Sequence, residues 1–229
     1  MSNEASRSVQ AAIAGIPVSD NDLLRWEVQR ARVAKQLLIE RLGPDATVAL
    51  LQTDLEASAK RARDWVAASM GRYAPSIIDV ESPGGTAGEF LGWIHDRFAA
   101  DDYAVLNGAS PEHYALRRSG EGWMDVTETI GGWGLPIRFY VVVTGELSDA
   151  PAPIDPDLTH RLIGRVRGLD GTEYGRVMHQ FGDTPTGFRA RLGVWWPAAA
   201  PRELVEGHCW HLACEFKLWI EAYLESRGS

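Results

Sequence analysis

Apolar residues recur at helical spacing through the first part of the chain. A Ser19-Asp20 pair precedes one such stretch, which contains Leu23, Leu24 and Trp26 and ends at Gly43. Ser and Asp are common helix N-caps, and Gly is common just after a helix end. A second amphipathic stretch covers residues 48–70, and a third, shorter one covers residues 89–98. The pattern predicts a flexible polar N-terminus over residues 1–18 and a helical region over residues 19–100.

From about residue 103 the apolar residues alternate instead. Short runs rich in β-branched and aromatic residues are separated by Gly, Pro and Asn, which is typical of strands and turns. The runs are YAVLNG, HYALRR, GWMDVTETI, PIRFYVVVTGEL, TEYGRVMHQF and FRARLGVWW. The last two flank GDTPTG and read as a long hairpin, and a closing helix is expected from Glu203 to about Ser226. Strands followed by one long helix indicate an α+β fold, with residues 101–229 forming a curved antiparallel sheet crossed by that helix.

Composition narrows the class of protein. The 229 residues carry a formal net charge of −8 without a cluster of Lys and Arg, which argues against nucleic acid and anionic membranes as partners. No apolar run approaches the roughly 20 residues of a membrane span, and the first residues do not resemble a secretory signal. Cys209 and Cys214 provide neither a disulfide framework nor a metal knuckle. We therefore expect a soluble cytoplasmic protein.

The closing helix carries the first candidate site. His211 and Glu215 are four residues apart, so they lie on one side of a helix. An imidazole and a carboxylate in this arrangement are a common pair of ligands for a divalent transition metal. An ordinary helical His–Glu contact is the alternative. His208 lies one turn earlier, where it would either replace a metal ligand or contact one from outside the metal site.

A second His–Glu pair comes from the predicted hairpin around Ser119–Gly122. With Ser119 opposite Gly122, paired residue numbers sum to 241, so His113 faces Glu128 across the strands, and the Cβ atoms lie about 5 Å apart. The same register places Ala115, Val126 and Met124 on that face and turns Asp125 and Thr127 away. A buried His–Glu pair needs a shared proton or a cation. A structural pair or a slipped register are the alternatives.

The two pairs together offer two nitrogen and two oxygen ligands. Such a set suits Zn²⁺, with Mn²⁺ or Fe²⁺ as lesser possibilities. The hypothesis is therefore one zinc ion per chain, bound where the sheet meets the closing helix.

Four motifs in series carry a family resemblance. They are FLGWIHDRFAADDYAVLNGASPEHYALR, VTETIGG, MHQFGDTPTGFRARLGVWW and HCWHLACEF. In this order they resemble the 2,4-diacetylphloroglucinol hydrolase/phloretin hydrolase family, whose members cleave a carbon–carbon bond between an acyl group and a phenolic ring. The resemblance implies a helical N-terminal region joined to a START-like helix-grip domain. It also implies zinc bound by His113, Glu128, His211 and Glu215, and it favours a homodimer formed through the N-terminal helices.

Further residues are candidates for handling the substrate. His179 resembles the His that opens the matching strand in the family and is a candidate general acid or base. Tyr103 and Tyr114 are candidate catalytic hydrogen-bonding groups. Trp123, Arg191 and His208 are candidates for binding an aromatic ketone or a polyketide-like substrate.

Three functions remain open at this stage. The first is metal-dependent hydrolysis of a carbon–carbon bond in an acylated phenol or a related β-diketone-like ketone. The second is a cyclase or lyase reaction on a polyketide-like substrate, because one fold supports many reactions. The third is a carrier that binds a small molecule without changing it.

Overall fold

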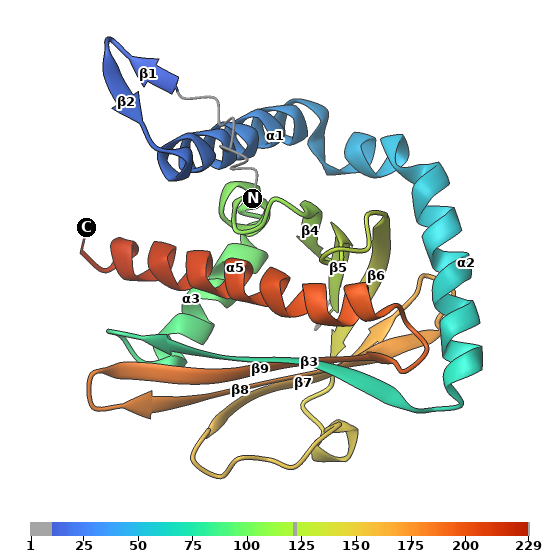
Figure 1. Ribbon diagram of the computed structural model, residues 1–229. Coiled ribbons are helices and arrows are strands. Elements are labelled where there is room, and N and C mark those ends of the chain that lie inside the picture. The colour runs from blue at the N-terminus through green and yellow to red at the C-terminus, as the bar shows by residue number, and fades with distance from the viewer. Residues whose placement is uncertain (1–10, 121–122, 229) are drawn as a thin grey trace, which may run out of the picture.

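The computed structural model describes residues 11–120 and 123–228 of the chain. Helices and strands are mixed along the chain, and the two longest helices, α1 and α5, lie near its two ends (Figure 1). In chain order the elements are β1 (Ala11–Ile13), β2 (Ile16–Val18), α1 (Asp20–Leu50), α2 (Gln52–Ser69), β3 (Tyr73–Ser82), α3 (Ala87–Ala99), α4 (Tyr103–Gly108), β4 (His113–Arg118), β5 (Trp123–Thr129), β6 (Pro136–Val143), the short 3₁₀ helix η1 (Leu147–Asp149), β7 (His160–Arg167), β8 (Glu173–Thr184), β9 (Gly187–Pro197) and α5 (Arg202–Ser226).

A seven-stranded sheet in the order β3-β9-β8-β7-β6-β5-β4 forms the centre of the molecule. Every neighbouring pair in it is antiparallel. Helix α5 lies along one face of this sheet (Figure 1). Its buried side chains recur every three or four residues, so one stripe of the helix faces the strands. The expected α+β class is confirmed at this level, as is the long hairpin of β8 and β9.

An aromatic cluster joins the helices to the sheet. The fully buried ring of Phe90 on α3 lies 5.4 Å from Phe188 of β9 and 5.7 Å from Tyr223 of α5, measured between ring centroids. Phe181 of β8 and Phe216 of α5 complete the group. Rings of this size bury much apolar surface, so α3 and α5 are held against the same strands.

The expectation of a helical region over residues 19–100 is wrong for residues 73–82. These residues form β3, an edge strand paired with β9 along its whole length. Their inward-facing positions include Ser76 and Ser82, both buried, beside the apolar Ile78 and Val80. Two serines on the inner face hide the alternation of apolar and polar residues that identifies a strand.

Two further segments differ from expectation. Residues 103–108 form the short helix α4 rather than a strand, because the side chain of Asp102 caps the helix by accepting from the backbone N–H of Val105. Strand β7, residues 160–167, lies in a stretch to which no element was assigned.

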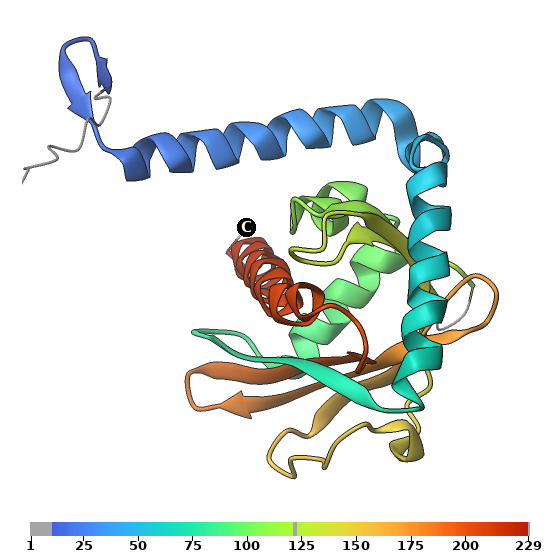
Figure 2. The ribbon, with the colours of Figure 1, turned by 45° about the vertical axis from the view of Figure 1, so that its right-hand side comes forward.

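The N-terminal residues form an arm that leaves the body of the molecule. Helix α1 bends at Gly43, whose φ of 74° and ψ of 167° are not helical, and Pro44 follows directly. Beyond the bend α2 runs down the side of the sheet, while the first part of α1 extends outward and carries the β1–β2 hairpin at its tip (Figure 2). Residues 11–18 therefore form a hairpin rather than the expected flexible segment, and residues 1–10 lie outside the described part.

The arm keeps apolar side chains on its surface. Trp26 is 63% exposed and Leu38 is 64% exposed, whereas Trp65 of α2 packs edge-on against Trp133 at 4.9 Å. The apolar side chains of these helices that pack within the chain include Ile39 and Val48 of α1 and Leu55 of α2. Among the helices of the described residues, none has a stretch long and apolar enough to cross a bilayer.

Candidate metal centre

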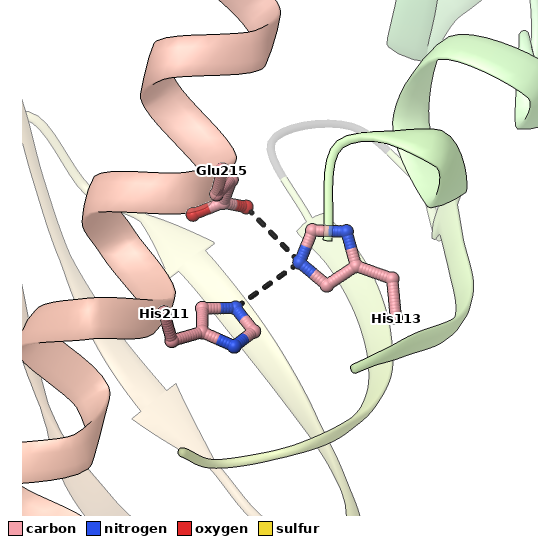
Figure 3. Close-up of side chains that lie close together, drawn as sticks. All are labelled: His113, His211 and Glu215. Carbon is pink, nitrogen blue, oxygen red and sulfur yellow. Dashed lines mark hydrogen bonds and ion pairs between the residues drawn. The ribbon is translucent and has the colours of Figure 1, made fainter. Parts of the chain in front are cut away.

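Three elements bring two His–Glu pairs together. His113 begins β4, Glu128 lies near the end of β5, and His211 and Glu215 occupy successive turns of α5. Figure 3 shows His113 pointing from its strand toward His211 and Glu215 on the helix. The Nε2 atom of His113 lies 3.1 Å from Nε2 of His211 and 3.4 Å from Oε1 of Glu215. Oε2 of Glu128 lies 3.7 Å from Nε2 of His113 and 3.5 Å from Nε2 of His211.

A β-bulge places His113 opposite Glu128. From Ala115 onward the paired residue numbers of β4 and β5 sum to 242, not to the expected 241, and the register shifts between His113 and Ala115. The predicted pairing of His113 with Glu128 is confirmed, but the turn alone does not produce it. Ala115 packs against Val48 and Leu55 of the N-terminal helices instead of facing the site. An extra residue at a bulge turns the following side chains to the other face.

The hydrogen bonds of the two imidazoles orient both rings in the same way. Nδ1 of His113 donates to the carbonyl oxygen of Leu106 at 2.9 Å, and Nδ1 of His211 donates to Oε2 of Glu112 at 2.8 Å. Each neutral ring then carries its lone pair on Nε2. Two lone pairs that face each other at 3.1 Å need a proton or a cation between them.

The two buried carboxyl groups determine the charge balance of the cluster. Glu128 and Glu215 are buried, and burial raises the pKa of Glu128 to about 7 and that of Glu215 to about 8, with His211 opposing both shifts. Burial lowers the pKa of His211, but Glu128, Glu112 and Glu215 outweigh it and raise the value to about 9. At pH 7 these pKa values keep Glu215 largely protonated, and an imidazolium at His211 balances Glu128. A divalent cation would displace these protons and leave both carboxylates ionised.

The spacing of the donor atoms fits a metal ion. A tetrahedral ion with bonds of about 2.0–2.2 Å separates its ligand atoms by about 3.3–3.6 Å. The four measured separations run from 3.1 to 3.7 Å. The buried donors form two overlapping triads that share His211: one with His113 and Glu215, the other with Glu128 and His208. The structure therefore contains buried His/Glu groups able to bind a metal ion.

Sequence reasoning missed Glu112. Glu112 directly precedes β4, and its carboxylate reaches Nδ1 of His211. A carboxylate on the outer nitrogen of a ligating His fixes the ring and raises its basicity. We expect Glu112→Ala to weaken metal binding about 10–100-fold and Glu112→Gln to weaken it less, because the amide oxygen still accepts. Competition with a fluorescent chelator measures this, and equal affinity in Glu112→Ala and the parent would contradict it.

Lys35 of α1 holds the segment that leads into β4. Its ammonium donates to the carbonyl oxygens of Asn107, Ser110 and His113 at 2.7–3.0 Å. We expect Lys35→Met to lower the free energy of unfolding by about 2 kcal/mol, because three carbonyls lose a charged donor. Urea denaturation measures the loss. The exposed Lys60, which pairs with Asp64, is the matched control, and Lys60→Met should stay within about 0.5 kcal/mol of the parent.

Two more buried histidines have the opposite hydrogen-bond pattern. Nδ1 of His179 accepts from the backbone N–H of Gly193 at 3.2 Å, and Nδ1 of His208 accepts from Nε1 of Trp196 at 3.3 Å. Each neutral ring therefore carries its proton on Nε2. This arrangement suits hydrogen-bond donation rather than metal ligation, although His208 is a member of the second triad.

A cavity of about 500 Å³ opens beside the cluster. Its walls are mainly aliphatic and aromatic, with Phe216 and Trp219 of α5 among them. Glu128, Glu215 and three of the four buried histidines line it: His179, His208 and His211. Apolar walls with a few convergent polar groups are typical of a small-molecule site.

Three predicted substrate contacts lie outside this cavity. Tyr103 lies near Asp101, Arg117 and Asp45 at the base of α1, and burial raises its pKa. The hydroxyl of Tyr114 hydrogen-bonds with Oγ1 of Thr129.

Arg191 lies on the other face of the sheet, where it pairs with Asp79, because its neighbour Leu192 is the residue opposite His179. The side chain of Trp123 is outside the described part. Asp125 points away from the cluster as predicted and pairs with Arg117 and Arg138.

No protein-family model matches the chain, and no curated protein matches it in sequence.

Proposed function

We propose that the protein is a zinc-dependent hydrolase that cleaves a carbon–carbon bond between an acyl group and a phenolic ring. The observation that carries the proposal is the pair of Nε2 atoms, 3.1 Å apart, flanked by two buried carboxylates at the wall of an apolar cavity. The family resemblance of the four motifs supports the reaction type.

The ligands would be His113, Glu128, His211 and Glu215, and one zinc ion per chain would supply a Lewis acid for the ketone or a neighbouring phenolate. Glu112 and the carbonyl of Leu106 hold the two imidazoles in the ligating tautomer. Phe216 and Trp219 provide apolar surface for an aromatic ring and exclude water from it.

The overall reaction consumes one water. The bond between the ring carbon and the acyl carbon breaks, the acyl carbon gains a hydroxyl group to become a carboxylic acid, and the ring carbon gains a proton. His179 enters as a hydrogen-bond donor to a substrate oxygen, because burial lowers its pKa to about 4 and Gly193 occupies its Nδ1. His208 donates in the same way through Nε2.

The finer features of the fold belong to the same proposal. We infer a START-like helix-grip domain, and the antiparallel sheet with α5 lying along one face supports this inference. The exposed apolar stripe of α1 would pack against a second copy of the chain, which gives a homodimer. Cys209 and Cys214 are both unpaired, which supports a reducing compartment such as the cytoplasm.

A ligand carrier is the second candidate. A protonated His211 satisfies the facing lone pairs without a metal, and its raised pKa supports that state. In that case the cavity binds an apolar molecule and releases it unchanged.

Elemental mass spectrometry separates the two candidates. The hydrolase predicts about one zinc per chain and its loss in Glu215→Ala. It also predicts release of a carboxylic acid from at least one acylphenol in a screen. No metal after purification without chelator, and none bound after adding zinc, would exclude the hydrolase and favour the carrier. A product of unchanged mass would indicate a cyclase instead.

A further inference from the structure

The cavity extends along β4 and β5 away from the His/Glu cluster. On β5 its wall includes Glu128, Val126 and Met124, alternate residues that face the same side. A strand rises about 3.3–3.4 Å per residue, so Met124 lies about 13 Å along the strand from Glu128. A ligand that fills the cavity from end to end is therefore elongated.

The cavity opens at its far end, because lining residues there are exposed to solvent. Arg118, which pairs with Met124 across the strands, lines the cavity and is exposed to solvent. His95 and Ala99 of α3 and Val143 of β6 are also exposed lining residues. These side chains surround the entrance, while the cluster is buried at the inner wall.

Arg118 is the single Lys or Arg among the lining residues that the structure describes. The acidic side chains of the lining, Glu128 and Glu215, both belong to the cluster. Within residues 11–120 and 123–228, the hydrogen bond of Arg118 is a long one of 3.4 Å to the carbonyl oxygen of Gly120, and no carboxylate pairs with it. Its neighbour Arg117, in contrast, pairs with both Asp45 and Asp125.

A guanidinium with no carboxylate partner among the described residues, beside an apolar wall, favours an anion. Its planar N–H groups match a carboxylate with two parallel hydrogen bonds. The net charge of −8 repels anions at long range, so attraction at this entrance depends on Arg118 itself.

We propose that Arg118 binds the anionic end of an elongated ligand, an aryl ketone whose alkyl chain ends in a carboxylate. The statement that a ketone occupies the inner end rests on the proposed function. The binding of the anion at the entrance rests on the cavity and on Arg118 alone.

Calorimetry with two matched probes tests this site. The first probe is a phenyl ketone with a pentamethylene chain that ends in a carboxylate, and the second is its primary amide. In low salt the parent should bind the acid about fivefold tighter than the amide, as for a partly exposed ion pair. Arg118→Gln should bind both equally, and Arg118→Lys should keep part of the preference. Arg191→Gln, which removes an arginine outside the cavity, should match the parent.

Three results would overturn the proposal: a parent that binds neither probe, a parent without a preference for the acid, and a preference that persists in Arg118→Gln. The titrations are repeated after metal removal. If the acid bound at the metal cluster instead of at Arg118, the preference of the protein for the acid would disappear without the metal and would persist in Arg118→Gln. A preference that depends on Arg118 in a protein without zinc and without hydrolysis would leave this site standing and reject the hydrolase.

Discussion

Replacing His211 by alanine should abolish metal binding by the protein. His211 belongs to both donor triads, and its Nε2 lies 3.1 Å from that of His113. Without it no triad of the structure remains complete, and Glu128 loses its nearest nitrogen partner. We expect metal affinity to fall by more than the roughly 10–100-fold that follows loss of an outer partner, with loss of acid release from acylphenols. Chelator competition and elemental analysis measure the first effect, and a product assay measures the second.

His208→Gln is the matched control for His211→Ala. It changes a buried His on the same helix one turn earlier, and the Gln amide oxygen can accept from Nε1 of Trp196 as Nδ1 of His208 does. We expect this variant to keep its metal and to lose substrate affinity. Loss of metal in both His208→Gln and His211→Ala would reassign the ligands to the second triad, whereas metal retained in His211→Ala would contradict both triads.

Replacing Gly207 by alanine should destabilise the fold and the metal site together. A Cβ atom at Gly207 would lie 1.9 Å from the carbonyl oxygen of Gly131, in the segment just after β5. Neither backbone can yield without moving α5 away from the sheet. We expect the free energy of unfolding to fall by about 2–3 kcal/mol, the range typical of overpacking. Metal affinity should fall as well, because the same shift separates His211 from Glu128.

The control is a second helical glycine with free space around it. Nothing lies within 4 Å of a Cβ atom at Gly92 of α3, so Gly92→Ala should stabilise the protein by about 0.5–1 kcal/mol through helix propensity alone. A Cβ atom at Gly131 would lie 2.2 Å from the carbonyl oxygen of Gly207 on α5, so Gly131→Ala should behave like Gly207→Ala. Denaturant titrations of the three variants decide the matter, and an unchanged Gly207→Ala would show that α5 does not depend on this approach.

Local spacing was enough to predict part of the centre. The i,i+4 rule places His211 and Glu215 on one side of α5, and the structure confirms it. The pairing of His113 with Glu128 was predicted through a register that is wrong by one residue, and a bulge restores it. Bulges follow from contacts on both faces of a sheet, so turn chemistry alone does not reveal them.

Other parts of the site depend on contacts that no local pattern records. Glu112 reaches His211 across 99 residues of sequence, and nothing in its own segment indicates that partner. Strand β3 was missed because its buried serines break the apolar alternation. The prediction that Arg191 contacts the substrate could have been avoided from the sequence. The turn between β8 and β9 pairs Leu192 with His179, so the neighbouring Arg191 faces the other side of the sheet.

The close approach of His113 and His211 also has a consequence for the order of folding. The two residues are separated by 98 positions, and α5 is the last element of the described chain to be synthesised. A metal ion held there would act as a cross-link over a long loop, and cross-links of that length restrict the unfolded chain strongly. Until α5 has left the ribosome, the growing chain holds only the His113–Glu128 half of the ligand set. Metal binding would therefore occur at the end of folding and would hold α5 against the sheet.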